Sequence, residues 1–110
     1  MSSSEVLEQL TAVIESRQRE RPAGSYVTSL FAGGHAAIAA KVREEAEELI
    51  EASASSDASH TAHEAADLIF HTLVLLAQAG VAPRDVFGEL ERRFGTGGLE
   101  EKRARSRGEE

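Results

Sequence analysis

Apolar residues recur at helical spacing along most of this 110-residue chain. Near the N-terminus, Leu7, Leu10 and Ile14 share one helix face, which is typical of a helix packed on a core. The same periodicity, bounded by capping and breaking residues, predicts an all-α fold with four helices. Four helices are expected at residues 4–20, 35–54, 61–78 and 83–94.

The first two helices are separated by a region rich in breaking residues. Ser4 is the expected N-cap of the first helix, and Pro22 ends it. Residues 21–34 then form a linking segment. Gly33 and Gly34 close this segment and are expected to break the chain before the second helix.

A short polar turn centred on Ser56 would fold the third helix back on the second. Residues 65–77 of the third helix are apolar nearly all the way round, and Gly80 is expected at C′. A helix of this kind is usually buried on every side. Because a chain of 110 residues has difficulty burying a whole helix, we expect a homodimer or larger assembly.

Composition limits the classes of protein further. With 110 residues and 41% hydrophobic content, the chain is expected to form one all-α domain over residues 1–94. Residues 95–110 are glycine-rich and then charged, which predicts a mobile tail. The absence of cysteine excludes disulfides, thiolate zinc sites and cysteine nucleophiles, and fits a reducing cytoplasm.

The chain shows neither a membrane-spanning nor a nucleic-acid-binding pattern. Its first residues lack the basic and apolar regions of a signal peptide, and its longest apolar run, residues 73–77, is too short to cross a bilayer. The net charge of −7 argues against broad nucleic-acid binding, which needs a basic face. We therefore expect a cytoplasmic protein.

Negative charge is concentrated in one stretch, residues 44–67, which holds eight acidic residues and no lysine or arginine. Four of the acids form two pairs with the same spacing, Glu45-x-x-Glu48 and Glu64-x-x-Asp67. Residues three apart lie on one helix face. In an antiparallel hairpin, Glu45 would face Asp67 and Glu48 would face Glu64.

Four converging carboxylates repel one another and need a cation. Hard oxygen ligands suit Mg²⁺ or Mn²⁺, and Asp67 is expected to be mostly buried among apolar neighbours. The alternative is a solvated acidic helix face, which is the preferred interpretation for Glu47 and Glu51. The spacing alone leaves both interpretations open for the two matched pairs.

Further charged residues have two interpretations each. Glu44 could ligate a second ion or act as general base towards water, or it could be an exposed acid. Lys41 could contact a substrate phosphate or pair with Glu45. Arg17 could contact phosphate or simply stabilise a helix C-terminus. His71 is better explained as a core histidine satisfied by a neighbour than as a metal ligand.

The acidic pattern, with residues 13–17, 24–30, 41–46, 64–71 and 80–86, resembles the all-α nucleoside triphosphate pyrophosphatases, the MazG-like group. Within that group, residues 24–30, which contain Ser25 and Tyr26, look most like the phosphoribosyl-ATP pyrophosphatase family. The likeness covers residues 6–93. The chain departs from the family pattern at Ala40 and Arg43, where lysine and glycine are common.

The resemblance implies a four-to-five-helix, intertwined homodimer that hydrolyses phosphoribosyl-ATP to phosphoribosyl-AMP and pyrophosphate with Mg²⁺, a step of histidine biosynthesis. It implies metal binding by two residue pairs and a catalytic role for Glu44 and Glu48. It also implies substrate contacts from the region before the acids. The metal residues are Glu45, Glu48, Glu64 and Asp67, and the substrate contacts are Arg17, Ser25, Tyr26, Thr28 and Lys41.

Two other functions fit the same sequence. One is a house-cleaning nucleoside triphosphate pyrophosphatase, which would share the metal site and differ in the base and ribose pocket. The other is a non-enzymatic helical interaction module with an acidic patch. A substrate panel distinguishes the first, and the response to Mg²⁺ distinguishes the second.

Overall fold

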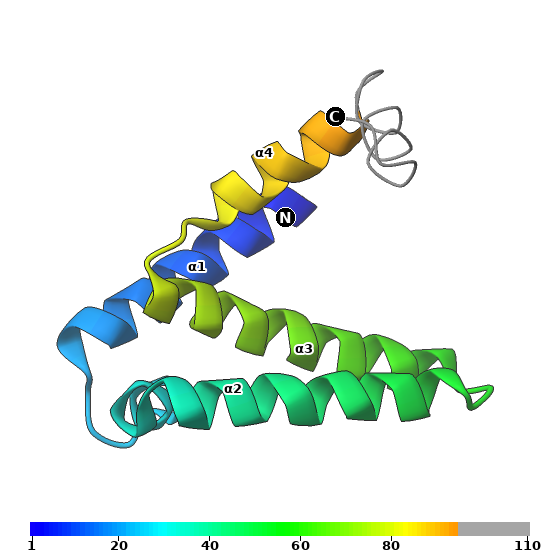
Figure 1. Ribbon diagram of the computed structural model, residues 1–110, viewed down its shortest axis with the longest axis horizontal. Helices are drawn as coiled ribbons and strands as arrows, with labels where there is room; N and C mark the ends of the chain where they lie inside the picture. The colour runs from blue at the N-terminus through cyan, green and yellow to red at the C-terminus, as the bar shows by residue number, and fades with distance from the viewer. Residues whose placement is uncertain (95–110) are drawn as a thin grey trace, which may run out of the picture.

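The computed structural model describes residues 1–94, which form four helices and no strand. Helices α2 and α3 form an antiparallel hairpin, while α1 and α4 leave one end of it and run alongside each other (Figure 1). The predicted all-α fold is confirmed. The predicted tail at 95–110 lies outside the described residues. The helices are α1 (Ser3–Glu20), α2 (Tyr26–Ser53), α3 (Ala58–Ala79) and α4 (Pro83–Phe94).

Local hydrogen bonds explain where the helices begin. Ser2, rather than the predicted Ser4, caps α1 by accepting from the backbone N–H of Glu5. Asp57 caps α3, so this helix begins three residues before the predicted position. Gly80 ends α3 in the left-handed conformation, with φ of 76°, as predicted.

Helix α2 differs most from the prediction, because residues 26–33 are helical rather than a linking segment. Ser25 caps this added portion by accepting from the N–H of Thr28. The predicted break is confined to Gly34, whose φ of 73° and ψ of −168° interrupt the helix. Only glycine adopts this conformation readily. Helix α2 therefore consists of two helical segments that meet at one residue.

The core is built where α1, α2 and α3 meet. Helix α4 contributes no buried residue, and its Phe87, Leu90 and Phe94 are exposed in the single chain. The α2–α3 hairpin therefore packs on α1 to form the core, and α4 lies outside that core. The core cluster consists of Ile14, Val27, Leu30, Phe31, Ile38, Leu73 and Val74.

The expectation that α3 is buried on every side is not met within one chain, where Ile69 is 51% exposed. Two helices can cover only part of its circumference. Among residues 1–94, no single helix is long and apolar enough to cross a membrane. Helices α3 and α4 pass that test only as a pair, which is bent by 110°.

Candidate functional site

Carboxylates from α2 and α3 converge in the half of the hairpin nearer its turn. Glu45, Glu48 and Glu64 each place one oxygen within 4.8 Å of the others, and these three residues are called the carboxylate cluster. The spacing of three turns Glu45 and Glu48 to the same face of α2. The antiparallel arrangement brings Glu64 of α3 against that face, as the sequence predicts.

Two members of the carboxylate cluster are removed from solvent. Glu45 is 6% exposed and Glu64 is 9% exposed. The Oε2 atom of each is buried without a hydrogen-bond partner among the described residues. Burial, together with the adjacent Glu48 carboxyl, raises the pKa of Glu45 above its usual value.

These unpartnered oxygens fit a divalent cation. An ionised carboxylate buried without compensation is costly. Several carboxylate oxygens close together are the donor set that Mg²⁺ and Mn²⁺ prefer. The residues present therefore fit the metal that the sequence led us to expect.

Asp67 lies at the edge of this arrangement rather than inside it. Its side chain is 39% exposed, so it is partly buried in the single chain and less enclosed than Glu45 and Glu64. Its carboxylate lies within 4.8 Å of ligand atoms of Glu64 and His63, and 3.4 Å from Nε2 of His63. One face of α3 is not covered by another helix of the same chain at this position. Asp67 is therefore accessible to solvent, whereas Glu64 is buried.

Lys41 and Glu44 form an ion pair beside the carboxylate cluster, with 3.3 Å between Nζ and Oε2. Of the two interpretations of Lys41, a phosphate contact or a pair with Glu45, the second is changed, because the partner is Glu44. The hydrogen bond to Glu44 raises the pKa of Lys41, which therefore stays protonated at neutral pH. The chain thus provides a cation of its own next to the acidic patch.

Four of the five expected substrate-contacting residues lie at or near helix ends, whereas Lys41 lies within α2. Ser25 and Tyr26 begin α2, where Oγ of Ser25 accepts the Thr28 N–H. The Oγ1 atom of Thr28 is buried without a partner among residues 1–94. Arg17 lies in the last turn of α1. The structure thus brings Glu45, Glu48 and Glu64 together, whereas among the described residues no hydrogen bond or ion pair joins Arg17 to them.

His71 is a buried histidine with two hydrogen-bonded ring nitrogens, in agreement with the expectation for a core histidine. One of its partners is the hydroxyl of Tyr26, 45 residues away in sequence. Sequence reasoning missed this pair because it assigned Tyr26 to a linking segment. Ser25, a residue type preferred at the N-cap, was the available signal for a helix there.

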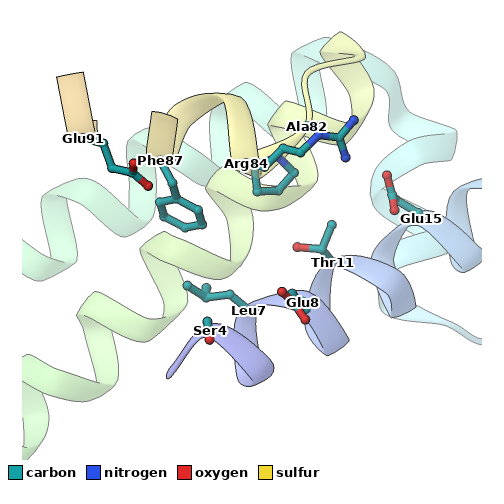
Figure 2. A pocket seen from close by; sticks show the side chains of 10 residues that line it. Ser4, Leu7, Glu8, Thr11, Glu15, Ala82, Arg84, Phe87 and Glu91 are labelled. Atoms are coloured by element: carbon teal, nitrogen blue, oxygen red, sulfur yellow. The ribbon is translucent and has the colours of Figure 1, made fainter. Parts of the chain in front are cut away.

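A groove lies elsewhere, between α1 and α4 (Figure 2). It has a volume of about 560 Å³, and its walls include Leu7 and Phe87. No residue of the carboxylate cluster lines it. The groove therefore belongs to a different region from the candidate active site.

The fold and the carboxylate cluster indicate a class of protein: an all-α protein in which carboxylates that could hold a cation lie between two antiparallel helices. The family model for phosphoribosyl-ATP pyrophosphohydrolase matches residues 7–94. The chain belongs to this family.

Similar proteins named phosphoribosyl-ATP pyrophosphatase occur in several bacteria. The protein from Rhodopirellula baltica is 49% identical over 102 residues, covering 90% of this chain and 85% of the relative. The protein from Rhizorhabdus wittichii is 50% identical, covering 93% of this chain and 96% of the relative. The protein from Methylococcus capsulatus is 46% identical, covering 94% and 99% respectively.

Proposed function

We propose that this protein hydrolyses phosphoribosyl-ATP to phosphoribosyl-AMP and pyrophosphate with Mg²⁺, a step of histidine biosynthesis. The observation that carries the proposal is the pair of buried, unpartnered oxygens in the carboxylate cluster, in a chain of this family. The names of the relatives supply the substrate. The cluster supplies a reason why this chain needs a divalent ion.

Under this proposal, the carboxylate cluster and Asp67 hold the metal. When bound, Mg²⁺ would neutralise charge on the phosphoryl oxygens and favour ionisation of water. The chain contributes fixed oxygen ligands, because Glu45 and Glu64 are locked by burial. Asp67 is more accessible than Glu45 and Glu64 and would therefore be open to an arriving substrate.

Charged residues around the metal site have separate roles. Glu44, exposed and paired with Lys41, or Glu48 within the cluster, orients the attacking water as general base. Lys41 offsets the repulsion between acidic residues and a polyphosphate. Arg17 is a second phosphate contact. Ser25, Tyr26 and Thr28 contact the rest of the substrate from the start of α2.

A substrate panel tests this function. The purified protein is offered phosphoribosyl-ATP and the common ribo- and deoxyribonucleoside triphosphates, with and without Mg²⁺, and released pyrophosphate is measured. We expect Mg²⁺-dependent release, fastest with phosphoribosyl-ATP. A preference for ordinary triphosphates would refute the substrate assignment, and a lack of Mg²⁺-dependent turnover on the whole panel would refute the enzyme.

The proposal includes a cytoplasmic homodimer. Apolar side chains exposed in the single chain support the dimer, since a partner could cover Ile69 on α3 and Phe87, Leu90 and Phe94 on α4. Sedimentation equilibrium would test it, because a monomer at micromolar concentration would contradict it. Cell fractionation tests the location.

A further inference from the structure

A histidine lies beside the carboxylate cluster on α3. His63 directly precedes Glu64 and lies one helical turn before Asp67. Its Nε2 is 3.4 Å from Oδ2 of Asp67. One ligand atom each of His63, Glu64 and Asp67 lies within 4.8 Å of the other two, and these three residues are called the histidine group. The histidine group offers an imidazole nitrogen, whereas the carboxylate cluster offers oxygens alone.

The distance between His63 and Asp67 matches the spacing of two ligands on one small cation. Zinc is held at about 2.1 Å by imidazole nitrogen and by carboxylate oxygen, in tetrahedral geometry. Two ligands at that distance and angle lie about 3.4 Å from each other. A protonated ring paired with the carboxylate spans the same distance, and a cation that binds there takes the place of the proton. Either form of the free ring is therefore compatible with a metal ligand.

The histidine group is reachable from solvent and includes a buried oxygen ligand. The side chain of His63 is 70% exposed and that of Asp67 is 39% exposed. Glu64 is 9% exposed, and its Oε2 has no hydrogen-bond partner among residues 1–94. A carboxylate has two oxygens with several lone pairs and can serve two neighbouring cations. Glu64 therefore belongs to both the histidine group and the carboxylate cluster.

The two groups differ in the metal that suits them. Carboxylate oxygens suit Mg²⁺ and Mn²⁺, whereas imidazole nitrogen suits Zn²⁺ and similar transition metals. Mg²⁺ keeps several of its waters and is bound through carboxylates. Three protein ligands, with a fourth position left for water, are usual in an open zinc site. The donor set of the histidine group therefore favours Zn²⁺.

We propose that His63, Glu64 and Asp67 form a second cation position, which takes Zn²⁺ in preference to Mg²⁺. Zn²⁺ bound there occupies Asp67 and draws on Glu64, so it removes oxygen ligands from Mg²⁺ and inhibits the reaction. The inhibitory role rests on the proposed function, whereas the zinc position does not. The exposure of His63 gives the ion a direct path from solvent.

Calorimetry with Zn²⁺ alone tests the position without substrate, on metal-free wild type, His63→Gln and His60→Gln. His63→Gln changes an exposed side chain and should lower the Zn²⁺ affinity at least about tenfold, since even a residue that only supports a ligand contributes that much. His60 is the matched control, because it lies 3.9 Å from Glu64 but outside the histidine group. His60→Gln should keep most of the affinity. No loss in His63→Gln, or an equal loss in both variants, would overturn the inference.

A spectroscopic titration identifies the histidine that binds. In NMR of the intact wild-type protein, the ring signals of His63 should change first as Zn²⁺ is added, before those of His60 and His35. An excess of Mg²⁺ alone should leave the ring signals of His63 nearly unchanged. A first change at His60 or His35 would overturn the inference.

Inhibition measures the consequence for the reaction. Pyrophosphate release with Mg²⁺ is followed as Zn²⁺ is added, and each protein is compared with its own rate without Zn²⁺. Half-inhibition of His63→Gln should need at least about tenfold more Zn²⁺ than that of wild type. Equal inhibition of the two proteins would overturn the inhibitory role. Zn²⁺ binding through His63 in a protein that cleaves no nucleotide would support the zinc position and refute the proposed function instead.

Discussion

The α2–α3 hairpin and the α1–α4 arm (residues 3–20 and 83–94) differ in which kind of group lies in an unfavourable environment. The hairpin buries acidic oxygens, and two of these have no partner among the described residues. The arm exposes apolar side chains, and α4 has no buried residue at all. Within one chain, the hairpin therefore buries polar atoms without partners, whereas α4 leaves its apolar side chains exposed, as the hairpin does at Ile50 and Ile69.

This difference indicates that the two regions lack different components. A buried carboxylate is stabilised by a positive charge and oxygen-directed coordination, which a small ion provides. An exposed apolar face is stabilised by contact with another apolar surface. The hairpin and the arm can therefore be tested separately, the first with metal and activity, the second with oligomeric state.

The largest effect is expected in the hairpin. Glu64→Gln removes a ligand and should lower Mg²⁺-dependent pyrophosphate release by at least about 100-fold, since metal stabilisation of the transition state amounts to several kcal/mol. Glu47→Gln on the exposed face of α2 is the matched control and should keep nearly full activity. Comparable activity in the two variants would remove Glu64 from the metal site.

A change in the arm should alter association first. Phe87→Glu places a charge on the exposed apolar face of α4 and should weaken the homodimer by about 2 kcal/mol, a roughly 30-fold rise in the dissociation constant. Sedimentation equilibrium measures this change. Phe87→Leu keeps an apolar side chain and should remain dimeric. Unchanged association of the glutamate variant would place the interface elsewhere.

The same glycine-to-alanine substitution should have opposite signs in the two regions. Gly34→Ala in α2 forces a side chain into a positive-φ conformation and should destabilise the protein by about 1–3 kcal/mol. Gly88→Ala in α4 meets no atom within 4 Å and should stabilise it by about 0.5–1 kcal/mol. Urea unfolding of both variants measures the two changes, and a stabilised Gly34→Ala would contradict the observed kink.

The smallest effects are expected from two carboxyls with oppositely shifted pKa values. Burial raises the pKa of Glu45, so the metal-free wild type is expected to lose stability as pH rises through that raised value. Glu45→Gln should therefore be more stable than wild type at pH 7, and the gain should disappear in acid. Arg92 and then Arg93 lower the pKa of Glu89 to about 2.

For Glu89 the sign is reversed. Its contribution is present above the unfolded pKa of 4.5 and is lost as pH falls towards about 2. Glu89→Gln should thus be slightly less stable than wild type at pH 7 and equal to it near pH 2. Because the pair is on the surface, salt should reduce the difference. Thermal unfolding measured across pH would show whether Glu45→Gln raises and Glu89→Gln lowers the stability at pH 7 relative to wild type.

The sequence predicts most of the fold because periodicity and capping act locally. The positions of α3 and α4, the end at Gly80 and the meeting of Glu45, Glu48 and Glu64 all follow from spacing on two helices joined by a short turn. The beginning of α2 was not predicted, because Gly33 and Gly34 were interpreted as the end of a loop and not as a kink within a helix.

Other features depend on packing that spacing does not encode. The exposure of Asp67 depends on how far α2 covers α3. The bond between Tyr26 and His71 joins residues 45 positions apart, on either side of a kink. Lys41 can reach an acid either three or four residues further along the same helix. It pairs with Glu44, at a spacing of three, and not with Glu45, at a spacing of four.

The kink at Gly34 divides the proposed active site into two units that could be redesigned independently. Residues 26–33 carry Tyr26 and Thr28, whereas the carboxylates of α2 follow the kink. Variation confined to the segment before Gly34 would change which nucleotide is accepted while leaving the ion-dependent chemistry in place. A library for altered selectivity should keep this glycine fixed and randomise only the residues that precede it.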